Sequence, residues 1–300
     1  MELPAYHPFR SVKAKEDYLA LYDRMAARWP VASQTRLVET SHGQTFVRIS
    51  GSADAPPLVL LPGLGATSLM WAPNVAALSK SYRTYAVDSI YDNGRSIYIR
   101  HLDSVDHFMT WLDELLAALA PNQRVNLLGV SYGGWLTGQF ALRFPDRLAK
   151  AVLIAPAATV RPLRTWFLVR ALLSLLPHRW FAKNFMYWIF EDYAHKDEAG
   201  RRWVDEEIEA TRLALRCFKS RSWGARPTML TDEELRGLRP STLFMVGEHE
   251  KIYAVPKALR RLRAVAPQIK IEVIPGAGHD VTMLQAELVS RKVVEFLQQP

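Results

Sequence analysis

Short apolar runs alternate with longer amphipathic stretches through most of the chain. Six runs are apolar on both faces, which is typical of strands buried inside a parallel sheet. These runs are Leu58–Leu61, Thr84–Val87, Val125–Leu128, Ala151–Ile154, Leu243–Val246 and Ile271–Ile274. The stretches between them show helical periodicity, and they include Val105–Leu119, Leu136–Phe144, Pro256–Val265 and Gln285–Leu297. The alternation predicts an α/β protein with an open, mostly parallel sheet and helices on both faces.

The N-terminal part of the chain follows a different pattern. A helix is predicted over Lys13–Trp29, because large apolar residues recur on one of its faces. These residues are Tyr18, Tyr22, Met25 and Trp29. Two β-patterned runs follow, Arg36–Thr40 and Gln44–Ile49, and the turn Ser41–Gly43 between them predicts a hairpin. With these two runs, the expected sheet has eight strands.

The strand–helix alternation stops between Ala158 and Pro227, where the sequence is helical and rich in aromatic residues. We interpret residues 158–227 as a helical cap, inserted into a core formed by residues 1–157 and 228–300. The aromatic residues are Trp166, Phe167, Trp180, Phe181, Phe185, Tyr187, Trp188, Phe190 and Trp203. Most of them are expected to form the cap's own core, and some to line an apolar ligand pocket. The basic residues among them have two interpretations: they keep a surface solvated, which is simpler, or they contact anionic lipid.

Composition excludes several classes of protein. The chain has 300 residues, 49% of them hydrophobic, and a net charge of +8, but it contains no long basic run and no nucleic-acid-binding module. No apolar run reaches the ~20 residues of a membrane span, and Met1–Pro4 lacks a signal pattern. We therefore expect a cytoplasmic protein without nucleic-acid partners or stable membrane insertion. The single cysteine, Cys217, excludes an intrachain disulfide and a thiolate zinc site. The sequence leaves open whether the protein forms a homodimer.

The strongest chemical signal is Gly-Val-Ser-Tyr-Gly at Gly129–Gly133, which follows a predicted strand and opens a predicted helix. A serine at such a sharp turn lies in a strained backbone conformation, and its neighbours two residues away must be small. The turn lifts the hydroxyl above the sheet, close to the positive end of the helix dipole. This context predicts that Ser131 is a nucleophile.

A serine nucleophile needs a histidine base that is oriented by a carboxylate. Of the eight histidines, His279 follows the strand Ile271–Ile274 at the same sheet edge as Ser131, whereas His7, His42, His178 and His195 are expected to be solvated. The loop after Leu243–Val246 supplies two candidate acids, and its position favours Glu250 over Glu248. His249 lies beside this acid and is therefore a poor candidate for the base.

Two backbone amides are expected to form an oxyanion hole. One is the amide of Tyr132, directly after the nucleophile, and the other is that of Leu64 in the glycine-containing loop after Leu58–Leu61. No cofactor is expected. The run that includes His101, Asp103 and His107 has the spacing of metal ligands. A metal site is nevertheless not expected there, because Asp103 and Ser104 have the pattern of a helix cap.

These features together resemble the α/β-hydrolase superfamily over nearly the whole chain, in the order serine, acid, histidine. More narrowly, the sequence resembles bacterial carboxylesterases of the naproxen esterase group, in which the acid is a glutamate. The residues that carry this resemblance are Trp29-Pro30, Glu39–Gly43, Gly129–Gly133 and Gly247–Glu250. Pro62 stands where many superfamily members have histidine, and serine at the elbow argues against haloalkane dehalogenases and epoxide hydrolases.

The resemblance implies a serine carboxylic-ester hydrolase that acts on small to medium apolar or aryl esters through an acyl-enzyme intermediate. Two alternatives stay open: a non-catalytic hydrolase-fold protein that binds small ligands, and a related hydrolase acting on lactones, amides or lipids. A nucleotide site is a weaker alternative. Gly63, Gly65 and Asp88 imitate a dinucleotide fingerprint, but Ser68 stands at the position of its third glycine.

Overall fold

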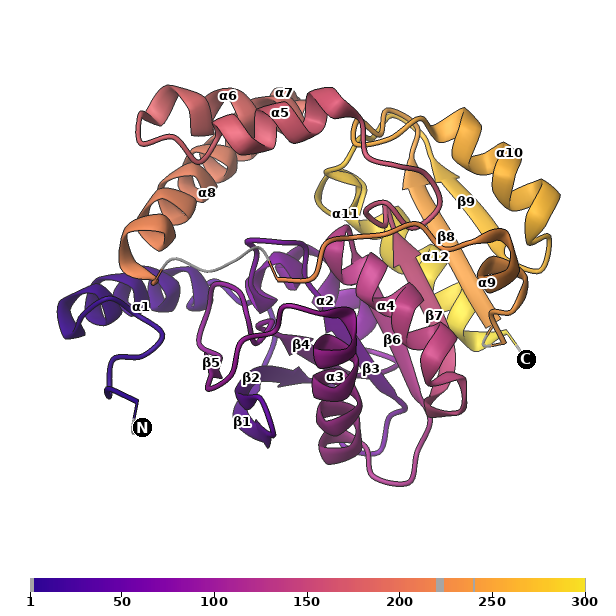
Figure 1. Cartoon of the computed structure of the whole chain (residues 1–300), viewed down its shortest axis with the longest axis horizontal. Helices are drawn as coiled ribbons and strands as arrows, with labels where there is room; N and C mark the ends of the chain where they lie inside the picture. The colour runs from indigo at the N-terminus through magenta and orange to yellow at the C-terminus, as the bar shows by residue number, and fades with distance from the viewer. Residues whose placement is uncertain (1–2, 220–223, 240, 300) are drawn as a thin grey trace.

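A mostly parallel sheet forms the centre of the molecule (Figure 1). The computed structural model describes residues 3–219, 224–239 and 241–299. The sheet has nine strands in the order β1-β2-β4-β3-β6-β7-β8-β9, with β5 paired to β2. Their bounds are β1 Gln34–Thr40, β2 Gly43–Ser50, β3 Pro57–Leu61, β4 Arg83–Val87, β5 Ile97–Tyr98, β6 Val125–Val130, β7 Leu148–Ile154, β8 Ser241–Gly247 and β9 Lys270–Ile274.

All eight predicted strands are present, and the predicted hairpin joins β1 to β2. The strand β2 pairs antiparallel with β1, β4 and β5, whereas β3, β4 and β6–β9 form the parallel part. The ninth strand, β5, was not predicted, because a strand of two residues is too short to carry a period-2 pattern.

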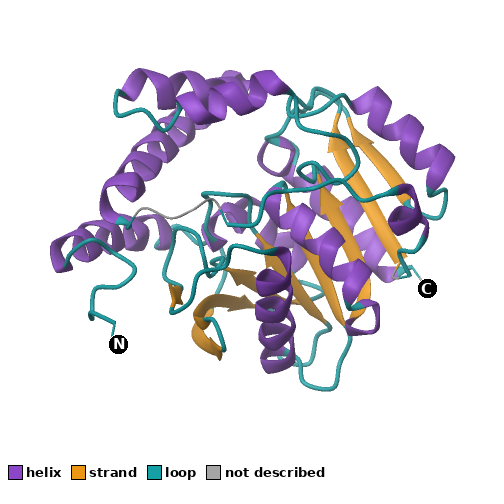
Figure 2. Ribbon diagram, viewed as in Figure 1, coloured by secondary structure: helices purple, strands orange, loops and turns teal. Residues whose placement is uncertain are grey.

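Helices cover both faces of the sheet (Figure 2). Alternate side chains of β3 enter different cores: Val59 and Leu61 belong to the core that includes residues of α3, α4 and α10, while Leu58 and Leu60 belong to the core with α2 and α12. The helices outside the 158–227 stretch are α1 Val12–Ala26, α2 Ala72–Leu78, α3 Val105–Leu119, α4 Tyr132–Arg143, α9 Asp232–Arg236, α10 Val255–Val265, α11 Val281–Leu284 and α12 Ala286–Gln298. Because both faces of the sheet are buried, the sequences of its strands are uninterrupted apolar runs.

The described residues of the 158–227 stretch form four helices: α5 Thr165–Leu173, α6 Arg179–Ile189, α7 Glu191–Lys196 and α8 Glu198–Cys217. Helices α5–α7 lie beyond the end of the sheet toward which β8 and β9 point, and α8 runs from there to α1 (Figure 1). The described residues of this stretch form no strand, apart from an isolated bridge between Phe218 and Phe9. The assignment of residues 158–227 as a separate cap stays a prediction.

Asp88, at the carboxyl end of β4, is fully buried and ties three segments together. Its carboxylate accepts hydrogen bonds from the Ser68 amide (2.7 Å), the Arg95 amide (2.9 Å) and the Tyr22 hydroxyl (3.3 Å). Burial raises the pKa of Asp88, and these donors oppose that increase. The carboxylate is therefore engaged within the fold, which argues against the dinucleotide interpretation.

We predict that Asp88→Asn lowers the free energy of unfolding by about 2–4 kcal/mol, because an amide nitrogen replaces an oxygen that accepts from buried donors. Urea denaturation measures the change. Asp54→Asn is the matched control, because Asp54 is exposed, and we expect a change within about 0.5 kcal/mol. Equal effects of the two substitutions would contradict the structural role of Asp88.

Candidate active site

Ser131 forms the sharp turn between β6 and α4. Its backbone has φ 53° and ψ −112°, a region that non-glycine residues avoid. Hydrogen bonds fix its peptide groups: the Ser131 amide donates to the Ile154 carbonyl (2.9 Å), and the Ser131 carbonyl accepts from the Ala157 amide (2.9 Å). Strain of this kind persists only where the surroundings hold it, and it is common at functional sites.

The glycines on either side of Ser131 allow close backbone contacts. A Cβ atom on Gly129 would overlap the Gly133 carbonyl, and one on Gly133 would lie 2.5 Å from the carbonyl oxygens of Leu61 and Pro62. Helix α4 therefore packs directly on the backbone of the loop that follows β3. This contact explains the Gly-x-Ser-x-Gly pattern in steric terms.

His279 and Glu250 come together at the same edge of the sheet, after β9 and β8 respectively. The distance from His279 Nδ1 to Glu250 Oε2 is 2.8 Å, and the Glu250 side chain is fully buried. The other carboxylate oxygen, Oε1, accepts from the amides of Lys251 (2.7 Å) and Ile252 (2.9 Å). Both oxygens are thus occupied, and the carboxylate has a fixed orientation.

This pairing determines the chemistry available to His279. An ionised carboxylate only accepts hydrogen bonds, so Nδ1 of His279 carries the proton and Nε2 of the neutral ring is free to act as a base. Burial lowers the pKa of His279, but the charge and hydrogen bond of Glu250 and the charge of Asp280 outweigh it, and the net shift is upward from 6.5. The ring is therefore poised to take up a proton.

The other candidate acid and base have different partners. Glu248 Oε2 accepts from the Gly276 amide (3.1 Å), and His249, which is half-exposed, contacts Asp192 with 3.3 Å between Nδ1 and Oδ2. The structure therefore pairs His279 with Glu250, as the loop position suggested.

The expectation that four other histidines are solvated is half correct. His178 and His195 are exposed, but His7 and His42 are buried. His7 Nε2 lies 2.7 Å from the Tyr98 carbonyl oxygen, and the His42 ring packs beside that of His107. A turn or terminus predicts exposure only where no other segment covers it.

In the described part of the chain, no cluster of histidine, cysteine and acidic side chains could hold a metal ion.

The loop after β3 lies beside the elbow. A Cβ atom on Gly63 would be 3.6 Å from Ser131 Cβ. The amides on either side of Leu64 have partners, because the Gly63 amide contacts Met70 Sδ (3.3 Å) and the Gly65 amide donates to Asp92 Oδ2 (2.8 Å). At the elbow, Tyr132 is the first residue of α4, a position at which the amide has no intrahelical acceptor. The roles of Leu64 and Tyr132 as oxyanion donors stay predictions.

Comparisons with known proteins agree with this architecture. The model of the alpha/beta hydrolase family matches residues 58–292. The chain belongs to the alpha/beta hydrolase family. The hydrolase is 35% identical to the uncharacterized carboxylesterase nap of Bacillus subtilis, over 93% of this chain and 91% of the relative, and 32% identical to carboxylesterase YbfK of Bacillus subtilis, over 96% of both.

A solved structure with the same fold is that of naproxen esterase from Bacillus subtilis. Its TM-score to the hydrolase is 0.86 at 32% sequence identity, and the match covers 99% of this chain and 100% of the other. The resemblance to the naproxen esterase group that the sequence indicated is confirmed.

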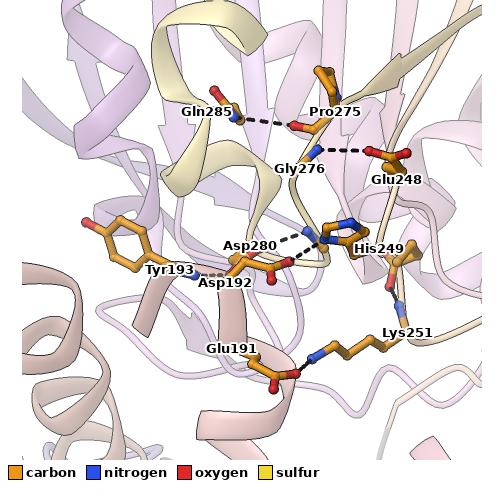
Figure 3. Close-up of polar contacts among 12 residues, drawn as sticks. Glu191, Asp192, Tyr193, Glu248, His249, Lys251, Pro275, Gly276, Asp280 and Gln285 are labelled. Atoms are coloured by element: carbon orange, nitrogen blue, oxygen red, sulfur yellow. Dashed lines mark hydrogen bonds and ion pairs between the residues drawn. The ribbon is translucent and has the colours of Figure 1, made fainter. Parts of the chain in front are cut away.

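Polar contacts tie α7 of the hydrolase to the loops that carry Glu250 and His279 (Figure 3). The Tyr193 amide donates to Asp280 Oδ2 (2.6 Å), and Lys251 Nζ donates to the Trp188 carbonyl (2.7 Å) and also pairs with Glu191. Asp280, fully buried, accepts a second bond from the Gly278 amide (3.1 Å) through Oδ1. The sequence carries no local signal for this role of Asp280, because its partner is a backbone amide 87 residues away.

We predict that Asp280→Asn destabilises the hydrolase by about 1–3 kcal/mol, because one buried amide then faces another donor instead of an oxygen. Denaturant titration measures the loss. Asp192→Asn, in α7 next to Tyr193, is the matched control: its partner His249 is half-exposed, so we expect a loss of at most about 0.5 kcal/mol. A larger loss in the control than in Asp280→Asn would refute this assignment.

Proposed function

We propose that the protein is a serine carboxylic-ester hydrolase with Ser131, His279 and Glu250 as its catalytic triad. The observation that carries the proposal is the buried hydrogen bond between His279 Nδ1 and Glu250 Oε2, at the sheet edge where the elbow presents Ser131. The similarity to proteins named carboxylesterases, over more than nine-tenths of the chain, supports an ester as the substrate.

The reaction begins when His279 Nε2 takes the proton of the Ser131 hydroxyl and the oxygen attacks the ester carbonyl. Glu250 stabilises the imidazolium that forms. The amides of Leu64 and Tyr132 donate to the oxyanion of the tetrahedral intermediate. His279 then protonates the departing alcohol, which leaves an acyl group on Ser131, and activates the water that releases the acid. We expect small to medium apolar or aryl esters as substrates, because the helices beyond the sheet edge are rich in aromatic residues.

Ser131→Ala is expected to remove both turnover of a p-nitrophenyl ester and covalent labelling by a fluorophosphonate, because the other hydroxyl of the elbow, that of Tyr132, donates to the Ala225 carbonyl (2.8 Å). The measurements are p-nitrophenol release and mass spectrometry of the labelled protein. Labelling that persists in the variant would exclude Ser131 as the nucleophile. A wild-type protein that binds esters without an acyl-enzyme burst would indicate a binding protein instead.

Glu250→Gln is expected to lower kcat by about three to four orders of magnitude, because the amide no longer orients and stabilises the His279 imidazolium. Glu248→Gln is the matched control two residues away. Its side chain accepts from the Gly276 amide, and a glutamine oxygen preserves that bond, so we expect kcat within about threefold of wild type. The opposite result would assign the acid to Glu248.

The pH profile follows from the raised pKa of His279. Catalysis needs neutral Nε2, so kcat/KM is expected to fall as the pH drops through this pKa, and the midpoint of the acid limb is expected above 6.5. Asp280→Asn removes one of the negative charges that raise the pKa and leaves Glu250 in place. The acid limb of the Asp280→Asn profile is therefore expected at a lower pH than the acid limb of wild type. The measurement is kcat/KM between pH 5 and 9 with a soluble ester. An unchanged limb would contradict the charge effect of Asp280.

A further inference from the structure

An exposed apolar surface covers the outer face of α5 and the turn between α5 and α6. We call it the apolar cap patch. Its residues are Trp166, Leu168, Val169, Leu172, Leu173, Leu175, Leu176 and Trp180. Leu172 is 65% exposed, and the indoles of Trp166 and Trp180 are 58% and 57% exposed. Exposed large apolar side chains that gather in one place usually mark a contact surface for a protein or a membrane.

The burial pattern of α5 shows that this surface is not needed for packing. None of its residues is fully buried. On the inner side, Phe167 packs near the rings of Phe185 and Trp188, with centroids 6.1 and 6.5 Å away, and it contacts the main core. The exposed residues Leu168, Val169, Leu172 and Leu173 have the i, i+4 spacing of one helical face, and Leu175 and Leu176 extend the patch into the turn after α5.

Charge accompanies this apolar surface. The 30 residues from Arg161 to Phe190 contain five Arg and Lys and no Asp or Glu. The basic residues are Arg161, Arg164, Arg170, Arg179 and Lys183. Arg164 and Lys183 are exposed, and the Arg170 guanidinium lies over the rings of Trp166 and Trp188, 5.0 and 4.9 Å from their centroids. Five of the eight net positive charges of the chain thus come from one tenth of its length.

We propose that the apolar cap patch docks on an anionic lipid surface. An apolar helical face flanked by Arg and Lys, without acidic residues, is the pattern of helices that lie in a bilayer interface. The leucines and indoles would enter the boundary between headgroups and acyl chains, and the basic side chains would meet the lipid phosphates.

A second copy of the chain fits the patch less well. A two-fold dimer would place the patch against itself, so the basic residues Arg161, Arg164, Arg170 and Lys183 of the two copies would face each other with no carboxylate from this segment between them, while Arg179 pairs with Glu209 of α8. An anionic bilayer supplies both the apolar medium and the opposite charge. The docking goes beyond the proposed ester hydrolysis and does not depend on it, because it uses none of the triad residues.

The test is co-sedimentation of the full chain with phosphatidylcholine vesicles, with and without phosphatidylglycerol. We expect binding to the anionic vesicles that weakens as salt is added. The double variant Leu172→Ser/Leu176→Ser is expected to bind at least about tenfold more weakly, since two leucines lose their apolar contact. Arg164→Gln is expected to lower the affinity for anionic vesicles about fivefold.

Matched controls come from exposed residues outside the patch. Leu37→Ser on β1, where Leu37 is 48% exposed, and Lys80→Gln, next to α2, should bind vesicles as wild type does. Turnover of a soluble short-chain ester, measured on every variant, shows whether each is folded. If the wild-type protein does not turn over the ester, the proposed function is contradicted, but the vesicle binding can still be interpreted. Circular dichroism then shows whether each variant is folded.

Three outcomes would overturn the proposal. One is the absence of sedimentation with anionic vesicles, and another is binding that the patch variants do not weaken. The third is a dimer in sedimentation velocity that Leu172→Ser/Leu176→Ser dissociates, because the patch would then be covered by a second copy of the chain.

Discussion

The candidate site depends on one backbone constraint, the unfavourable conformation of Ser131 between β6 and α4. The positive φ is maintained because the neighbouring strands hold both peptide groups of the residue: Ile154 at the end of β7 accepts from one, and Ala157 donates to the other. On the opposite side, Gly133 packs against the carbonyls of Leu61 and Pro62. The same contacts that strain the serine therefore bring the loop after β3 next to it, so Ser131 and the candidate oxyanion loop are placed together.

A second close contact joins the loops of the acid and the base. A Cβ atom on Gly247 would overlap the carbonyls of Ala277 and Gly278, and the His249 amide donates to the Ala277 carbonyl (2.8 Å). These backbone contacts fix the loop of Glu250 relative to the loop of His279, in addition to the hydrogen bond between their side chains. Because α7 contacts both loops, through Glu191 with Lys251 and through Tyr193 with Asp280, movement of this helix would disturb Glu250 and His279 together.

Local sequence patterns predicted the elements that have a strong local signal. Strands buried on both faces were recognised from their apolar runs, and the elbow from its glycines, because each pattern reports a constraint within about ten residues. The contact of Tyr193 with Asp280 has no such signal, since 87 residues separate the partners and the donor is a backbone amide. The burial of His42 was missed for the same reason: the residue that packs on it, His107, belongs to a distant helix.

The location of the apolar cap patch follows from how its segment is attached. At one end, α6 and α7 are held to the loops of Glu250 and His279 by partly buried polar contacts of Trp188 and Tyr193. At the other end, α8 packs on α1, where Ala214 and Cys217 share a buried cluster with Tyr18 and Tyr22. Helix α5 has no comparable anchor on its outer face, and its leucines stay exposed. Eight large apolar side chains are thus exposed together beside Arg161, Arg164, Arg170 and Lys183, and packing within the fold does not account for their exposure, which supports contact of this face with another surface.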